Sequence, residues 1–212
     1  MFNVLAYPVE CWSWDDLLNE STKPTSSVGQ EPEKLFYLGQ KPLLTTLQLD
    51  LSASKVKKGG FKIAAFGTST TSLFKSNGMD ICAKQFYHTE EQVIEKNGAY
   101  MMKTVDILFE CRKQFQNLTM EIACVVWAQA LLNLVYSFIS QDSEVQPPFD
   151  IPKFRFVESA LAMENSLDDG KQNKTIFLVE EVIAKENQGC FWKYLNNVLP
   201  VPLMMTCKED EN

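Results

Sequence analysis

The sequence predicts an α+β fold in which a mostly antiparallel sheet packs against one long helix. Two observations lead to this prediction. Short segments on both sides of the chain's centre alternate apolar and polar residues, as strands do. Between them, residues 118–140 (LTMEIACVVWAQALLNLVYSFIS) are apolar almost all the way round a helix. Such a helix is expected to be buried on most of its sides.

The N-terminal part of the chain is expected to divide into an extension and a folded domain. Residues 15–34 are polar, contain prolines and show no sustained periodicity. We therefore expect a flexible extension over residues 1–40 and the domain over residues 41–212. The first strands of that domain are predicted at residues 43–51 (LLTTLQLDL), 61–66 (FKIAAF) and 81–87 (ICAKQFY).

The later elements follow from the same patterns. Two short helices are predicted before the long one, at residues 90–96 and 105–115. A proline-containing connection at 141–150 leads to strands at 154–163 (FRFVESALAM) and 175–183 (TIFLVEEVI).

Composition limits the classes of partner. The net charge of −7 disfavours a nucleic acid, because phosphate binding requires an excess of Lys and Arg. The longest apolar run is broken by polar residues, and the N-terminus lacks the positive start of a signal peptide. The six cysteines show no C-x-x-C spacing, which is typical of free thiols in a reducing compartment. We expect an intracellular, cytoplasmic protein with no membrane partner.

A glycine turn is the first feature that could carry chemistry. Residues 58–62 (KGGFK) join two predicted strands, and Gly59 and Gly60 would let backbone N–H groups approach an anion. An ordinary Gly-Gly hairpin turn is the alternative.

Lys84 is the second feature. Alternation places it with Cys82 and Phe86 on one face of a strand, among apolar neighbours. A partly buried lysine needs a negative partner, because an unpaired buried charge is costly. That partner is either a carboxylate such as Glu121 or a ligand phosphate held together with it.

Two acidic residues follow the apolar strand segment TIFLV. If Glu181 points to solvent, alternation turns Glu180 towards whatever the sheet faces. A solvated charge pair at a strand end is the alternative. The sole histidine, His88, is expected in a loop, and one histidine is too few for most histidine-based metal sites or a nucleophilic triad.

Three motifs recur in one order along the chain. Gly60-Phe61-Lys62 forms a glycine-phenylalanine-basic turn, and residues 81–86 (ICAKQF) have the form V-x-V-K-x-F. A pattern E-x-x-I…G-x-F-x-K-Y-x-x-N is met by Glu180, Ile183, Gly189, Phe191, Lys193, Tyr194 and Asn197. With the long helix between the second and third motifs, this series resembles the N-terminal lobe of the alpha-kinases. These atypical protein kinases include myosin heavy chain kinase and elongation factor 2 kinase. Residues 48–197 carry the resemblance, with an insertion before Gly189.

The resemblance implies an ATP site. It places Lys84 at the α- and β-phosphates, with Glu121 as its helix partner, and Glu180 at the adenine edge. It places Gly59, Gly60 and Lys62 beside the loop over the phosphates, and Lys193 and Asn197 near the outer phosphates.

The chain also departs from the family. It has no D-x-Q-G motif after Asn197, and the family's zinc ligands cannot be assembled from His88 and Cys207. We therefore expect no zinc, no catalytic or metal-binding residue, and an inactive lobe without the C-lobe. Mg²⁺ is expected with ATP, although its protein ligands are missing.

An isolated lobe would expose its C-terminal apolar edge, which is formed by Leu195, Val198, Leu199, Val201, Leu203, Met204 and Met205. Another protein or self-association is expected to cover that edge. Two other interpretations stay open. One is a non-catalytic nucleotide-binding or protein-interaction module with an N-lobe-like fold, and the other is a plain scaffold domain.

Overall fold

The computed structural model describes residues 1–22, 41–75, 78–96, 99–141, 150–165 and 174–183 of the chain. The chain divides into two compact units, Met1–Val182 and Ile183–Asn212. The fold described below is that of the first unit.

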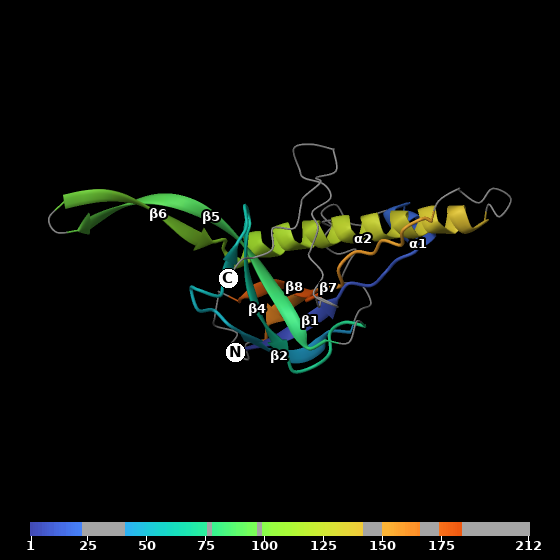
Figure 1. Ribbon diagram of the computed structural model, residues 1–212, viewed down its shortest axis with the longest axis horizontal. Coiled ribbons are helices and arrows are strands. Elements are labelled where there is room, and N and C mark those ends of the chain that lie inside the picture. Colours follow the sequence, from blue (N-terminus) through green and yellow to red (C-terminus); the bar gives the residue numbers. More distant parts are fainter. Residues whose placement is uncertain (23–40, 76–77, 97–98, 142–149, 166–173, 184–212) are drawn as a thin grey trace. The chain divides into compact units, whose positions relative to one another are not determined.

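The described residues form an α+β structure of eight strands and one long helix, with a second, short helix (Figure 1). All strand pairings are antiparallel, which confirms the predicted sheet. In chain order the elements are β1 (Phe2–Pro8), α1 (Trp14–Thr22), β2 (Leu43–Leu49), β3 (Lys57–Lys58), β4 (Lys62–Ser69), β5 (Asp80–Lys96), β6 (Ala99–Leu108), α2 (Cys111–Gln141), β7 (Ser159–Glu164) and β8 (Ile176–Glu181).

Six of the strands close into a ring. Their order is β4-β2-β1-β7-β8-β5, and β5 pairs again with β4. The remaining strands extend this barrel: β3 pairs with the first half of β4, and β6 pairs with the second half of β5. Among the described residues, closure leaves the barrel-forming part of each of the six strands with a neighbour on both sides, whereas β5 continues beyond the barrel into its pairing with β6.

The barrel interior is filled by small and medium apolar side chains. The alternation predicted for residues 43–51 and 81–87 is confirmed, because Leu47, Ile81 and Ala83 point into this core. Its other buried members are Val4, Ala6, Leu73, Phe74, Ala160, Ala162, Phe177 and Val179. Alanines at several inward positions keep the narrow interior from being overpacked.

Helix α2 packs on the outside of the barrel and forms a second apolar cluster with β7, β8 and α1. Ser13 caps α1, since its hydroxyl accepts a hydrogen bond from the Asp16 N–H at 3.1 Å. Trp14 of α1 then contacts Trp127 of α2 edge to face, with ring centroids 5.8 Å apart.

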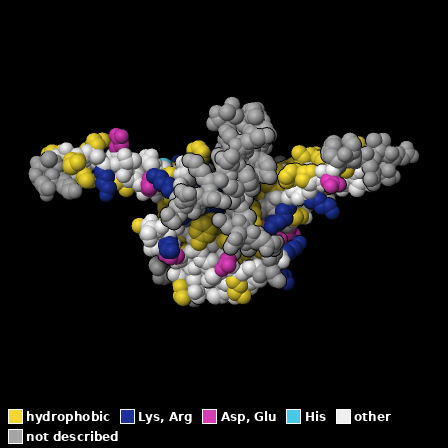
Figure 2. Space-filling model, viewed as in Figure 1, with side chains coloured by type: hydrophobic (Ala, Val, Ile, Leu, Met, Phe, Trp, Pro, Cys, Tyr) yellow, Lys and Arg dark blue, Asp and Glu magenta, His cyan; other side chains and the backbone are white. Residues whose placement is uncertain are grey.

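Burial of α2 is more limited than the sequence predicts. Its buried residues are Gln114, Leu118, Thr119, Ile122, Val126 and Ala130, whereas Leu131, Leu134, Val135 and Phe138 are exposed within the described part of the chain. The reason is geometric: a barrel surface covers one stripe of a helix, and α2 is apolar all round. Figure 2 shows hydrophobic side chains at the surface over α2.

By length and composition, α2 is the one described helix that could cross a membrane. The sequence predicts no membrane span, because polar residues interrupt the apolar run. Core helices of soluble proteins meet the same criterion, so the finding is weak evidence in either direction.

Two predicted features are wrong. Residues 1–22 belong to the folded unit, because β1 lies between β2 and β7 in the barrel; residues 23–40 lie outside the described ranges. Residues 90–96 form part of β5, not a helix. Of the helix predicted at 105–115, residues 105–108 form the end of β6, whereas residues 111–115 are helical as the start of α2. Glu, Gln and Lys favour a helix locally, but cross-strand pairing overrides that preference here.

Candidate functional site

Four of the predicted site residues lie on the side of the barrel that faces α2. Lys62 comes from β4, Lys84 from β5, Glu180 from β8 and Glu121 from α2. The strand register explains why the three side chains from the sheet lie close together. Lys62 of β4 pairs with Phe86, which is two positions after Lys84 in β5. Glu180 of β8 pairs with Cys82, which is two positions before Lys84. Side chains two positions apart on a strand share a face, so these residues look outward together.

Lys84 and Glu180 form an ion pair across β5 and β8. Their side chains are 27% and 19% exposed, so the pair is partly removed from water yet still reachable from it. The expectation that Lys84 needs a negative partner is confirmed. The partner is Glu180 rather than Glu121, because Glu180 occupies the neighbouring strand on the same face.

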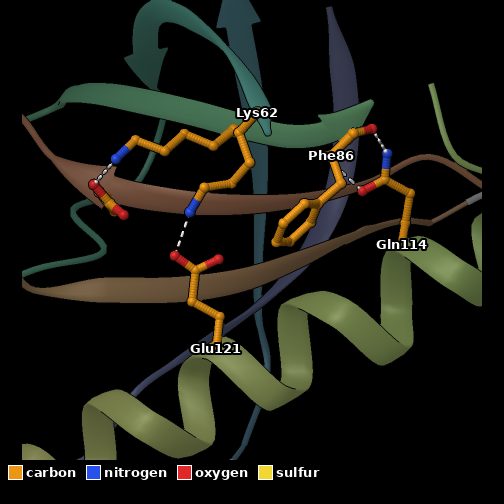
Figure 3. Close-up of polar contacts among 6 residues, drawn as sticks. Lys62, Phe86, Gln114 and Glu121 are labelled. Atoms are coloured by element: carbon orange, nitrogen blue, oxygen red, sulfur yellow. Dashed lines mark hydrogen bonds and ion pairs between the residues drawn. The ribbon is translucent and has the colours of Figure 1, made fainter. Parts of the chain in front are cut away.

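Lys62 and Glu121 form a second ion pair, which joins β4 to α2 (Figure 3). The ammonium of Lys62 also lies 5.4 Å from the centre of the Phe86 ring, a distance at which a cation is attracted to the aromatic face. The second carboxylate oxygen of Glu121, Oε2, is buried and has no hydrogen-bond partner among the described residues.

Gln114 fixes the start of α2 against β5. Its Oε1 accepts the Phe86 N–H at 2.9 Å, and its Nε2 donates to the Phe86 carbonyl at 2.6 Å (Figure 3). Glu121 lies seven residues further on, on the same face of the helix. The contact of Gln114 with Phe86 therefore fixes the rotation of α2 about its axis and directs Glu121 towards Lys62. The sequence analysis does not identify Gln114, because it stands in the mostly polar segment CRKQFQN and nothing in that segment marks it as buried.

The pKa of the Cys82 thiol is affected by the charged groups that lie close to it. Burial raises the pKa of Cys82, while the nearby ammonium groups of Lys84 and Lys62 lower it and the Glu180 carboxylate raises it. Three of the four charged groups, Lys62, Lys84 and Glu180, are therefore close enough to Cys82 to shift its pKa.

The glycine turn joins β3 to β4, and hydrogen bonds to Lys62 and Tyr87 fix Gly59 within it. Gly59 donates its N–H to the Lys62 carbonyl at 2.8 Å, and the Tyr87 hydroxyl donates to the Gly59 carbonyl at 2.7 Å. This is the hairpin geometry of the alternative interpretation. Next to the turn, the Asp106 carboxylate accepts a hydrogen bond from Lys58 at 2.6 Å and raises the pKa of Lys58.

Glu181 does not point to solvent as the sequence analysis assumes. Its side chain is 5% exposed and pairs with the guanidinium of Arg155, which lies just before β7. The Glu158 N–H also donates to its Oε1 at 2.8 Å. The Glu181 carboxylate in turn raises the pKa of Arg155. Both acids of the strand end are therefore paired, on opposite faces of β8.

We expect Arg155→Met to lower the free energy of unfolding by about 1–3 kcal/mol, because it leaves a buried carboxylate without its guanidinium. Arg155 is itself 56% exposed, so water entering the space limits the loss. Urea unfolding measures the change. Arg155→Met combined with Glu181→Gln should recover part of it, and a double variant as unstable as the sum of the singles would contradict the pairing.

The other predicted positions have separate outcomes. Lys193 and Asn197 lie outside the described residues. His88 lies within β5 rather than in a loop, stacks on Phe109 with ring centroids 5.1 Å apart, and contacts Glu90. Within the described ranges, no group of three or more His, Cys, Asp or Glu side chains is placed to hold a metal ion.

Comparison of the chain with protein-family models, with curated proteins and with solved structures gives no match.

Proposed function

We propose that the chain binds ATP on the α2-facing side of its barrel, as the nucleotide-binding lobe of an alpha-type protein serine/threonine kinase. One observation supports this proposal above the others. Lys62, Lys84, Glu121 and Glu180 are far apart in the sequence, and each is named by the alpha-kinase resemblance. They come together on one surface as two Lys–Glu pairs.

The electrostatics of the surface suit a polyphosphate. Both lysines are partly buried, so part of the cost of taking them out of water is already met in the folded chain. Each is held by a single carboxylate, and a phosphate oxygen can replace that carboxylate with a similar charge-assisted hydrogen bond. The two pairs are neutral as a group, so a ligand can use both lysines only by displacing both glutamates, and a polyphosphate can offer a negative oxygen to each lysine.

Lys84→Met should weaken ATP binding by about 10- to 100-fold, the loss of one charge-assisted hydrogen bond of roughly 1.5–3 kcal/mol. Fluorescence titration or calorimetry with MgATP measures the affinity. Lys55→Met, at an exposed lysine between β2 and β3, is the matched control and should bind as the wild type does. Equal affinities of wild type and Lys84→Met would overturn the assignment of this site.

A non-catalytic interaction module is the second candidate. It is favoured by the fact that both lysines are already paired with glutamates, as in a cluster that only stabilises the fold. Absence of ATP binding by the wild-type chain would support this candidate. In that case Lys84→Met would change the stability of the chain, and neither the variant nor the wild type would bind MgATP.

A further inference from the structure

The second half of β5 and the whole of β6 form a hairpin (Figure 1), and among the described residues no further strand pairs with either of its edges. Ten register pairs run from Tyr87↔Leu108 to Lys96↔Ala99 without a bulge. The barrel strands β4 and β8 pair with β5 only as far as Phe86 and Lys84. Beyond Tyr87, therefore, each strand of the hairpin pairs only with the other within the described part of the chain, although the side chain of Asp106 contacts Lys58 of β3.

The hydrogen bonds at the base of the hairpin show which groups face outward. The Tyr87 N–H donates to the Phe61 carbonyl at 3.1 Å, on the β4 side, so it points away from β6. Its neighbour Phe86 points the other way, since its carbonyl accepts the Phe109 N–H at 3.2 Å. Antiparallel pairing alternates strictly from these two residues onward. The outward N–H and C=O groups of β6 are thus those of Tyr100, Met102, Thr104, Asp106 and Leu108.

The two open edges differ in charge. The open part of β5 carries Glu90, Glu91 and Glu95, and charged side chains are a common guard against edge pairing. β6 carries one cation, Lys103, and one anion, Asp106, which pairs with Lys58 of β3, and the strand has no proline, glycine or bulge. The edge of β6 is therefore long and regular and has no net charge, unlike the open edge of β5.

The hairpin also exposes apolar side chains. Val93, Tyr100, Met101 and Met102 are each more than half exposed. An isolated two-stranded hairpin is marginally stable in water, whereas a sheet of more strands with apolar residues on its faces is stable. A strand added to β6 would supply this missing partner.

We propose that β6 pairs antiparallel with β6 of a second copy, so that the two hairpins form one four-stranded sheet. The outward groups of β6 alternate donor and acceptor and are self-complementary about a two-fold axis perpendicular to the sheet. Charge favours this arrangement, since it places the glutamates of both β5 strands on the outer edges and away from each other. Pairing through β5 would instead bring Glu90, Glu91 and Glu95 of two copies together.

Proline substitutions test the proposal. Thr104→Pro removes an outward N–H of β6 and leaves the hydrogen bonds to β5 in place. Glu91 lies opposite Thr104 in the register and faces the other edge, so Glu91→Pro is a control with the same backbone cost. Sedimentation velocity of the full chain measures the mass as a function of concentration. We expect wild type and Glu91→Pro to approach twice 24.1 kDa, and Thr104→Pro to need at least tenfold more protein to do so.

Thr104→Val, which keeps the N–H, should dimerise as the wild type does, and thermal unfolding checks that each variant is folded. A wild type that stays monomeric overturns the proposal, as does a dimer that Thr104→Pro leaves intact. A dimer broken by Glu91→Pro would assign the contact to β5, and growth beyond the dimer would indicate head-to-tail pairing of β5 with β6. Both outcomes contradict the pairing of β6 with β6.

Discussion

Gly67→Ala is expected to lower the free energy of unfolding by at least about 3 kcal/mol, because the new methyl group has no room. A Cβ at this position would lie 2.0 Å from the carbonyl oxygen of Gln48 and 2.9 Å from the Cα of Leu49. Both atoms belong to the backbone of β2, so no rotamer change relieves the clash. Gly67 pairs with Leu49 on one side and with Ile81 on the other, where β4 joins β2 to β5. Relief therefore requires the barrel to open at that junction.

Gly60→Ala is the matched control, since a Cβ there meets nothing within 4 Å. Its effect should stay within about 0.5 kcal/mol, as at other open surface positions. Urea denaturation gives both values from the midpoint and slope. If Gly67→Ala were as stable as Gly60→Ala, the close approach of β2 to β4 would be wrong, and with it this part of the ring.

Closure of the barrel is the part of the fold that the sequence could not supply. Alternation in residues 43–51 and 81–87 predicts strands and the faces that they bury, because that pattern is local. Pairing of β4 with both β2 and β5 depends on contacts between distant segments. In the sequence, Gly67 is one small residue in the segment FGTST. Only the position of the Gln48 backbone shows why a larger residue does not fit there.

The hairpin and β1 were missed for related reasons. The run of Glu, Gln and Lys at residues 90–96 favours a helix when it is read alone, and its partner strand lies beyond a turn. The segment Phe2–Pro8 (FNVLAYP) has no alternation of apolar and polar residues in its sequence, and the polar stretch after it indicates an extension when it is read alone. Local propensity failed where the decisive contacts were made with another strand.

Lys62, Lys84, Glu121 and Glu180 of the candidate site could be predicted from the sequence, whereas their pairing and the role of Gln114 could not. Lys84 and Glu180 follow from strand patterns and from the resemblance, and both face α2 together with Lys62. Which side chain pairs with Glu121 depends on the residue at which α2 begins and on the rotation of α2 about its axis. The helix begins at Cys111, so residues 111–115, which the sequence assigns to a separate short helix, form the start of α2. Gln114 among them fixes the rotation of α2 about its axis.

Gln114→Leu should therefore have the second large effect, a loss of about 1–3 kcal/mol in the free energy of unfolding. Gln114 is 2% exposed, and it satisfies both the N–H and, through Nε2, the carbonyl of Phe86. Leucine has a similar volume, so the loss comes chiefly from the Phe86 N–H left without its partner rather than from a cavity. Each unsatisfied buried group costs about 1–3 kcal/mol, and the Phe86 carbonyl keeps its bond to Phe109.

Gln129→Leu is the control for this change, because it replaces the same residue type in the same helix. The Gln129 amide donates to the exposed Asn133 of α2 itself, so its loss should cost less than about 1 kcal/mol. Urea unfolding compares the two variants, and hydrogen exchange at the Phe86 amide, faster only in Gln114→Leu, locates the effect. Gln114→Leu should also weaken ATP binding, since α2 would no longer hold Glu121 beside Lys62. A variant that lost stability yet bound ATP unchanged would separate the anchor of the helix from the proposed nucleotide site.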